Sequence, residues 1–113
     1  MVIDTGGVAT LASSMTRLTE DEIRTGLDSL PNWSLSEDHT TISTSFQLAD
    51  FAAALDLVNR IGGEAERLNH HPDIDIRWNT VTLALSTHSE GGLTALDLDL
   101  AGRINNLAAA DRR

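Results

Sequence analysis

Three of the four histidines in this 113-residue chain lie between positions 70 and 88. His70 and His71 are adjacent and precede Pro72, whereas His88 stands in the sequence THSEGG. An imidazole titrates at about pH 6.5, so it can both donate and accept a proton near neutrality. Imidazoles beside a carboxylate such as Glu66 can also bind a divalent metal. Three interpretations are open: proton transfer, metal binding, or ordinary polar residues that begin and end strands.

The spacing of these residues disfavours a metal site. Helical zinc ligands stand four residues apart, whereas adjacent histidines on an extended chain point to opposite faces. The chain has no cysteine, which excludes a disulfide, a thiolate zinc site and a cysteine nucleophile. No G-x-S-x-G elbow surrounds Ser86 or Ser89, so serine nucleophilic catalysis is disfavoured as well. The remaining alternative to proton transfer is that His70 and His71 simply begin a strand before Pro72.

Two alternating segments flank Asn79-Thr80 and predict a β-hairpin. If residues 79–80 form a two-residue loop, His71 lies opposite His88. This register places the apolar pairs on one face. These pairs are Trp78 with Val81, Ile76 with Leu83, and Ile74 with Leu85. Directly opposed residues have Cβ atoms about 4.5–5.5 Å apart. The sequence therefore predicts two neighbouring imidazoles at the open end of the hairpin, with His70 beside them.

The rest of the chain supplies three helices and a second hairpin. Thr19 and Glu22 form a capping box for a helix that ends before Pro31, and Thr94 with Asp97 forms a weaker one for the last helix. Residues 33–46 alternate as two strands around a turn. The order α-β-β-α-β-β-α predicts an α+β two-layer domain, a four-stranded antiparallel sheet with three helices on one face. We expect a flexible lead over residues 1–17 and one domain over residues 18–110.

The middle helix, within residues 48–69, carries an apolar stripe at helical spacing. Its members are Phe51, Leu55, Val58, Gly62, Ala65 and Asn69, with Ala54, Ile61 and Leu68 beside it. Gly62 and Gly63 each weaken a helix by about 1 kcal/mol relative to Ala. Two glycines together therefore indicate either close approach of another backbone, such as that of a second subunit, or a bend.

Charge and composition exclude some classes of partner and location. The formal net charge is −9 and the sequence pI about 4.6, so a phosphate backbone would be repelled and direct nucleic-acid binding is disfavoured. No apolar run approaches the roughly 20 residues that span a bilayer, which argues against membrane insertion. The N-terminal residues do not resemble a signal peptide. We expect a cytoplasmic protein.

The residues around the histidines resemble a known family, the pterin-4a-carbinolamine dehydratases, in the form associated with actinobacterial members. The family motif E-K-x-N/D-H-H-P is similar to residues 66–72, and its T-H, Gly-containing loop and L-[ST] are similar to residues 87–94. The motif continues with Asp97 and residues 100–101, and the likeness extends from about 18 to 108. H-H-P alone would be unspecific, but H-H-P followed by T-H at this distance is specific.

The resemblance implies a fold and a reaction. The family fold is a four-stranded antiparallel sheet with three helices on one side. The reaction is dehydration of a 4a-hydroxytetrahydropterin to a quinonoid dihydropterin, in tetrahydropterin recycling, with no cofactor and no metal. His70 and His71 would be acid/base groups, and His88 would bind or protonate the leaving hydroxyl. Substrate binding would fall to Glu66, Asn69, Pro72, Thr87, Ser89 and Glu90, with Glu66 expected to orient His70 or contact the pterin.

The resemblance also implies assembly and an alternative function. Family members form homodimers or homotetramers through the helices and the sheet. Related domains act instead as non-catalytic partners, as transcriptional coactivators or assembly factors. Because this chain retains His70, His71 and His88, we do not expect it to be such a non-catalytic partner. Two departures from the family pattern, Ile74 where many relatives have Trp and Arg67 where they have Lys, remove no catalytic position.

Overall fold

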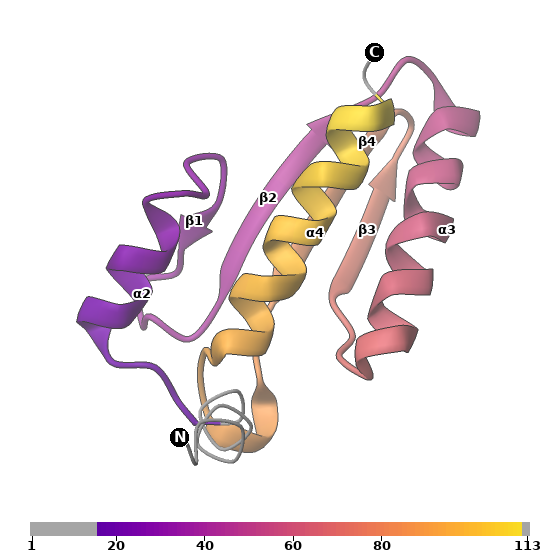
Figure 1. The fold of residues 1–113 in the computed structure, drawn as a ribbon. Helices are drawn as coiled ribbons and strands as arrows, with labels where there is room; N and C mark the ends of the chain where they lie inside the picture. Colours follow the sequence, from indigo (N-terminus) through magenta and orange to yellow (C-terminus); the bar gives the residue numbers. More distant parts are fainter. Residues whose placement is uncertain (1–15, 112–113) are drawn as a thin grey trace.

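The computed structural model describes residues 16–111 (Figure 1). Most of the predicted N-terminal lead, residues 1–15, lies outside the described residues, so the domain boundary stays a prediction. The elements in chain order are α2 (Glu20–Leu27), β1 (Ser34–Leu35), β2 (Ile42–Gln47), α3 (Phe51–Leu68), β3 (Asp73–Arg77), β4 (Thr80–Leu85), the 3-10 turn η1 (His88–Glu90) and α4 (Ala95–Asp111). The predicted α+β class and element order are confirmed.

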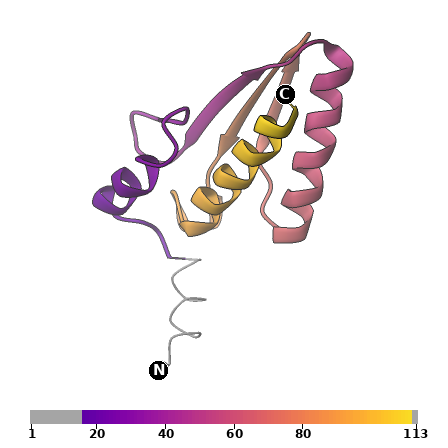
Figure 2. The same ribbon diagram turned by 45° about the horizontal axis from the view of Figure 1, so that its top comes forward.

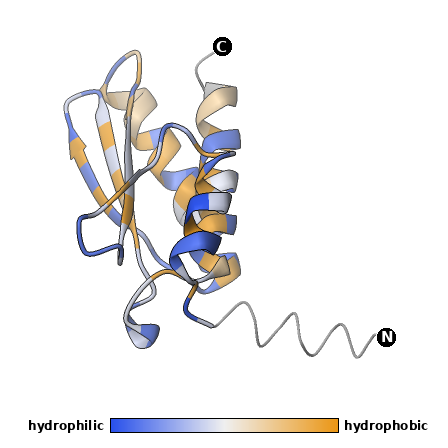
Figure 3. Ribbon diagram, turned by 90° about the vertical axis from the view of Figure 1, so that its left-hand side faces the viewer, coloured by the Kyte–Doolittle hydropathy of each residue, from blue (hydrophilic) through white to orange (hydrophobic). Residues whose placement is uncertain are grey.

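The four strands form one antiparallel sheet in the order β1-β2-β4-β3. Figure 3 shows the sheet on one side and the helices on the other, and Figure 2 shows α3 and α4 side by side. Alternate residues of β2 and β4 face the helices, because side chains alternate across a strand. Among them are Ile42, Phe46, Val81, Leu83 and Leu85, all buried. The outward face carries hydroxyl residues, with Ser45 and Thr82 bonded at 2.8 Å.

The capping box predicted for the first helix is present. The Thr19 hydroxyl accepts the Glu22 N–H at 3.1 Å, and the Glu22 carboxylate accepts the Thr19 N–H at 2.8 Å. These two bonds satisfy donors that a helix start leaves without partners. Ile23, one turn further on, is buried in the core. The prediction that the chain leaves the helix before Pro31 is also confirmed.

The predicted stripe of α3 only partly matches its buried face. The buried residues are Ala54, Leu57, Ile61 and Ala65. Phe51 and Leu55 are instead 46% and 41% exposed. The helix carries apolar residues on two sides, so helical spacing alone did not show which side faces the core. Nothing within the described chain lies within 4 Å of a Cβ placed on Gly62 or Gly63.

The register predicted for the β3–β4 hairpin is wrong by two residues. Arg77 pairs with Thr80 and Ile76 with Val81, so the two-residue loop is Trp78-Asn79. Trp78 adopts a positive φ of 56° and is 67% exposed, instead of lying on the apolar face. Asn79 holds the loop in place, because its carbonyl accepts the Leu48 N–H at 2.7 Å and its side chain donates to the Leu48 carbonyl at 3.0 Å. A slip of two residues keeps every side chain on its face, so the apolar alternation could not reveal it.

Among residues 16–111, no helix has the length and apolar character needed to cross a membrane.

Candidate active site

The turn that delivers His70 and His71 is made by Asn69 at the end of α3. Asn69 has φ 52° and ψ 44°, the left-handed conformation that often ends a helix. Its N–H donates to the Glu66 carbonyl at 3.1 Å, and the N–H of His70 donates to the Ala65 carbonyl at 3.0 Å. These two bonds form a Schellman motif, which reverses the chain into β3. The adjacent histidines leave this turn toward different surroundings.

His70 points into the protein and contacts Asp97. The distance from Nε2 of His70 to Oδ1 of Asp97 is 2.5 Å. His70 is 9% exposed and Asp97 is fully buried. A buried carboxylate needs hydrogen-bonding partners, because an unpaired charge is costly to remove from water. His70 therefore has a fixed ring position, and it is not a loose polar residue at a strand start.

Asp97 also joins the loop after β4. Its second oxygen, Oδ2, accepts the Thr87 hydroxyl at 2.7 Å and the Thr94 N–H at 2.9 Å. The two threonine hydroxyls lie 2.9 Å apart. One carboxylate thus connects the first turn of α4, the residue before His88, and His70. The sequence indicated Asp97 as a helix-capping residue and as part of the family motif, but its place beside His70 was missed.

His71 lies on the surface and pairs with Glu66. Nε2 of His71 is 2.5 Å from Oε2 of Glu66, and both side chains are more than half exposed. The expectation that Glu66 orients His70 is therefore not met, since its partner is the next histidine. The carboxylate fixes the direction of the His71 ring.

His88 begins the short turn η1 and is exposed. It does not stand directly opposite His71, because regular pairing of β3 with β4 stops at Asp73 and Ala84. The predicted cross-strand pair of imidazoles is thus a consequence of the wrong register. His88 still lies at the same end of the sheet as His70 and His71, since β4 ends there and β3 begins there (Figure 1). The link between the two segments runs through Thr87 and Asp97.

The remaining residues expected to bind substrate lie in the same two loops. Pro72 is half-buried at the entrance to β3, and Ser89 and Glu90 are exposed in η1. The Ser89 hydroxyl is 3.4 Å from the Glu90 carboxylate. Gly91 ends η1 with φ 71°, and the N–H of Thr87 donates to the Gly92 carbonyl at 2.9 Å, which closes the loop.

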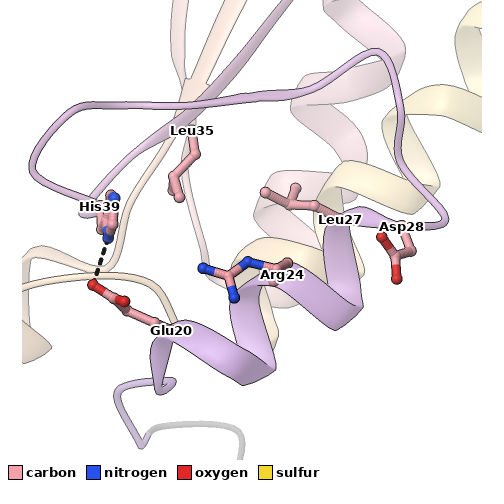
Figure 4. Close-up of a pocket in the computed structure, with 6 residues that line it drawn as sticks. All are labelled: Glu20, Arg24, Leu27, Asp28, Leu35 and His39. Atoms are coloured by element: carbon pink, nitrogen blue, oxygen red, sulfur yellow. Dashed lines mark hydrogen bonds and ion pairs between the residues drawn. The ribbon is translucent and has the colours of Figure 1, made fainter.

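Two further features lie outside this cluster. A hollow of about 200 Å³ is lined by α2 and the β1–β2 loop, and it contains His39, the fourth histidine (Figure 4). Nδ1 of His39 is 2.8 Å from Glu20. Within residues 16–111, no group of three or more histidines and carboxylates has the arrangement of a metal site.

A network of charges joins the two long helices near the site. Glu64 of α3 accepts from Arg67 at 2.8 Å and from Arg103 of α4 at 3.1 Å. Hydrogen bonds from Arg67, and then from Arg103, hold the pKa of the Glu64 carboxyl below its usual value. The hydrogen bond to Glu64 is also the main cause that raises the pKa of Arg103. These contacts fix the helix end that leads into His70.

The fold and this cluster define a small α+β protein with a histidine and carboxylate site between two loops. The sequence model described as pterin 4 alpha carbinolamine dehydratase matches residues 16–107. A relative from Nocardia farcinica, assigned as a pterin-4-alpha-carbinolamine dehydratase, is 54% identical over 91 residues, which are 80% of this chain and 94% of that protein. One from Mycobacteroides abscessus with the same assignment is 48% identical over 80% of this chain and 95% of the relative.

Two solved structures have a similar fold. A transcriptional coactivator/pterin dehydratase from Brucella melitensis superposes with a TM-score of 0.79 at 36% identity, covering 82% of this chain and 99% of that one. A pterin dehydratase-like RuBisCO assembly factor of the alpha-carboxysome shares the fold alone, at 18% identity and a TM-score of 0.59 over 68% of this chain and 89% of its own. The chain belongs to the pterin 4 alpha carbinolamine dehydratase family.

Proposed function

We propose that this protein catalyses dehydration of a 4a-hydroxytetrahydropterin to a quinonoid dihydropterin and water, as a step of tetrahydropterin recycling. Membership of the family supports the reaction. The observation that carries the proposal is the pairing of His70 with buried Asp97, together with the pairing of His71 with Glu66. Each imidazole has a carboxylate on one nitrogen, which leaves the other nitrogen for the substrate.

The reaction needs two proton transfers, and the chain offers groups for both. The hydroxyl at carbon 4a must take a proton to leave as water, and a ring nitrogen must lose one. We assign protonation of the hydroxyl to His88, which is exposed at the start of η1. Asp97 accepts a hydrogen bond from Nε2 of His70, which leaves Nδ1 of His70 able to act as a base.

His71 is assigned a further acid/base role, and the remaining loop residues would hold the substrate. Glu66 occupies Nε2 of His71, which leaves Nδ1 of His71 for proton exchange with the pterin. Asn69, Pro72, Thr87, Ser89 and Glu90 are assigned to substrate binding because their loops border the histidines. The steps are two proton transfers and cleavage of the bond between carbon 4a and the departing water, with no oxidation or reduction, so we expect that no resident metal or cofactor is required. A cytoplasmic location also stays a prediction.

The experiment that tests the function supplies the substrate directly. An aromatic amino acid hydroxylase generates the 4a-carbinolamine, and absorbance follows its dehydration with and without this protein. Acceleration over the uncatalysed rate supports the proposal. An unchanged rate with folded protein contradicts it.

We also propose that the chain forms a homodimer or homotetramer through α3. Phe51 and Leu55 are large apolar residues, exposed one helical turn apart. Gly62 and Gly63 continue along the same helix, and no described residue approaches the space beside them. A second copy of α3 could bury these residues and approach the glycines closely.

A second function, a non-catalytic interaction module, has one observation in its favour. The Brucella structure is described as a transcriptional coactivator as well as a pterin dehydratase. The exposed apolar part of α3 would then receive a different protein. The dehydration rate separates the two functions. An enzyme should lose activity when His70, His71 or His88 is replaced, whereas a non-catalytic interaction module should show no dehydration to lose.

A further inference from the structure

The segment before α2 lies across the loop that carries His88. The N–H of Leu18 donates to the Leu93 carbonyl at 2.7 Å, and the Leu18 side chain packs against the core. Leu18 thereby places its neighbour Arg17 over the backbone of residues 91–92. A Cβ atom on Gly92 would lie 2.8 Å from Nε and 3.3 Å from Cζ of Arg17. The guanidinium can lie this close only because Gly92 has no side chain.

Gly92 is directly connected to the candidate site. It forms a bridge with Thr87, whose N–H donates to the Gly92 carbonyl at 2.9 Å. The hydroxyl of Thr87 donates to Asp97, which in turn holds His70. The loop closed by this bridge contains η1 and therefore His88. Arg17 thus packs against the backbone of the same loop that carries His88.

The position of His88 depends on this loop. His70 and His71 each have a carboxylate partner, but among residues 16–111 no side chain bonds to the imidazole of His88. Its place is therefore set by the backbone of η1. That turn is short and its residues are exposed, which are features of a segment that opens easily.

We propose that Arg17 is a positioning residue, whose guanidinium covers the Gly91-Gly92 backbone and keeps the η1 loop in the arrangement that presents His88 to the substrate. A planar, weakly hydrated guanidinium suits such a contact better than an ammonium group. The kinetic consequence rests on the proposed dehydratase function, whereas the effect on loop order does not.

Removing the cover should change KM more than kcat. In Arg17→Ala the loop samples open arrangements, and the substrate binds only the closed fraction, so its apparent affinity falls by that fraction. We expect KM to rise about threefold to tenfold, while kcat stays within about twofold because the bound state is unchanged. Amide hydrogen exchange of residues 87–93 should become faster. A merely structural role would lower the thermal midpoint without raising the KM of the folded molecules.

A double-mutant cycle with Gly92 makes the test specific. Gly92→Ala should displace the guanidinium and raise KM as Arg17→Ala does, since all three atoms nearest to the added Cβ belong to Arg17. In the Arg17→Ala background, Gly92→Ala should raise KM little further. Gly91→Ala is the matched control: its φ of 71° strains any alanine, so its effect should persist in both backgrounds.

Two results would overturn the proposal. One is a Gly92→Ala effect of equal size with and without Arg17. The other is Arg17→Ala protein with wild-type exchange rates at residues 87–93. If the wild-type protein shows no dehydration at all, the proposed function fails, and the exchange measurements alone decide the role of Arg17.

Discussion

Oδ1 of Asp97 lies 2.5 Å from Nε2 of His70, and Asp97 is fully buried while His70 is 9% exposed. The other carboxylate oxygen is held by the Thr87 hydroxyl and the Thr94 N–H. A carboxylate fixed in this way sets both the orientation of the imidazole and the nitrogen that carries its proton. The first turn of α4 therefore determines which side of His70 faces a substrate.

The first prediction concerns that pair. Asp97→Asn keeps the shape of the side chain but has only one acceptor oxygen. It cannot accept from His70 on one side and from Thr87 and Thr94 on the other. We expect kcat to fall about 10²-fold, the lower end of what a positioned acid or base contributes. Steady-state dehydration kinetics measure this. Asp99→Asn is the control, because Asp99 lies on the same helix and bonds to Arg103 at the surface. Wild-type kcat in folded Asp97→Asn protein would refute the role of the pair.

The second prediction separates two roles of Asn69, backbone turn and substrate contact. Glycine tolerates the left-handed conformation of this residue, whereas alanine is strained by about 1 kcal/mol or more. Asn69→Gly should keep the stability of the wild type, and Asn69→Ala should lose roughly that amount in urea unfolding. Both variants should raise KM to a similar extent, because both lack the amide. An unchanged KM in Asn69→Gly would show that this side chain does not bind substrate.

The third prediction concerns Glu64, which joins α3 to α4. Hydrogen bonds from Arg67 and Arg103 lower its pKa in the folded protein below the usual 4.5. A lowered folded pKa gives stability that is present above the unfolded pKa and lost as pH falls through the folded value. Glu64→Gln should therefore be less stable than the wild type at pH 7, and the difference should shrink in acid.

Thermal unfolding across this pH range measures the Glu64 effect. Asp21→Asn serves as the control, because Asp21 is 95% exposed and lies 3.7 Å from its arginine partner. Its stability should follow the wild type at all pH values, since surface pairs contribute little. A Glu64→Gln difference that stays constant into acid would contradict the assigned cause.

The fourth prediction tests assembly through α3. Leu55→Glu places a charge in the exposed apolar part of the helix, and a charge buried without a partner opposes association. We expect sedimentation to show an oligomer for the wild type and a monomer for Leu55→Glu. Ala109→Glu, an exposed position near the end of α4, should assemble as the wild type does. A monomeric wild type, or an oligomeric Leu55→Glu, would contradict the proposed interface.

Local signals predicted much of the fold. The Thr19–Glu22 capping box and the element order are carried by neighbouring residues, and both are confirmed. The predicted alternation of buried residues is confirmed in β4 but not in β3, where Ile74 is 40% exposed. The hairpin register was missed because a slip of two residues preserves the alternation, and the bonds that select Trp78-Asn79 come from distant Leu48. The face of α3 was partly wrong because both sides are apolar.

In the candidate site, too, the features set by neighbouring residues could be predicted and the contacts between distant residues could not. The histidines could be selected from the sequence by type and spacing, but their partners could not. His70 and Asp97 are 27 positions apart, and Asp97 already had an explanation as a capping residue. Its Oδ2 does accept the Thr94 N–H, so the capping interpretation was correct yet incomplete. A buried carboxylate within the capping turn becomes informative only when the loop around it is seen.

The most direct test of the central claim, that histidines in these two loops catalyse the dehydration, is the rate of 4a-carbinolamine loss with single-histidine variants. His71→Ala and His88→Ala should each lower the catalysed rate about 10²-fold or more while the proteins stay folded. His39→Ala, which alters the histidine beside Glu20, should keep the wild-type rate. Full activity in both His71→Ala and His88→Ala would contradict the account.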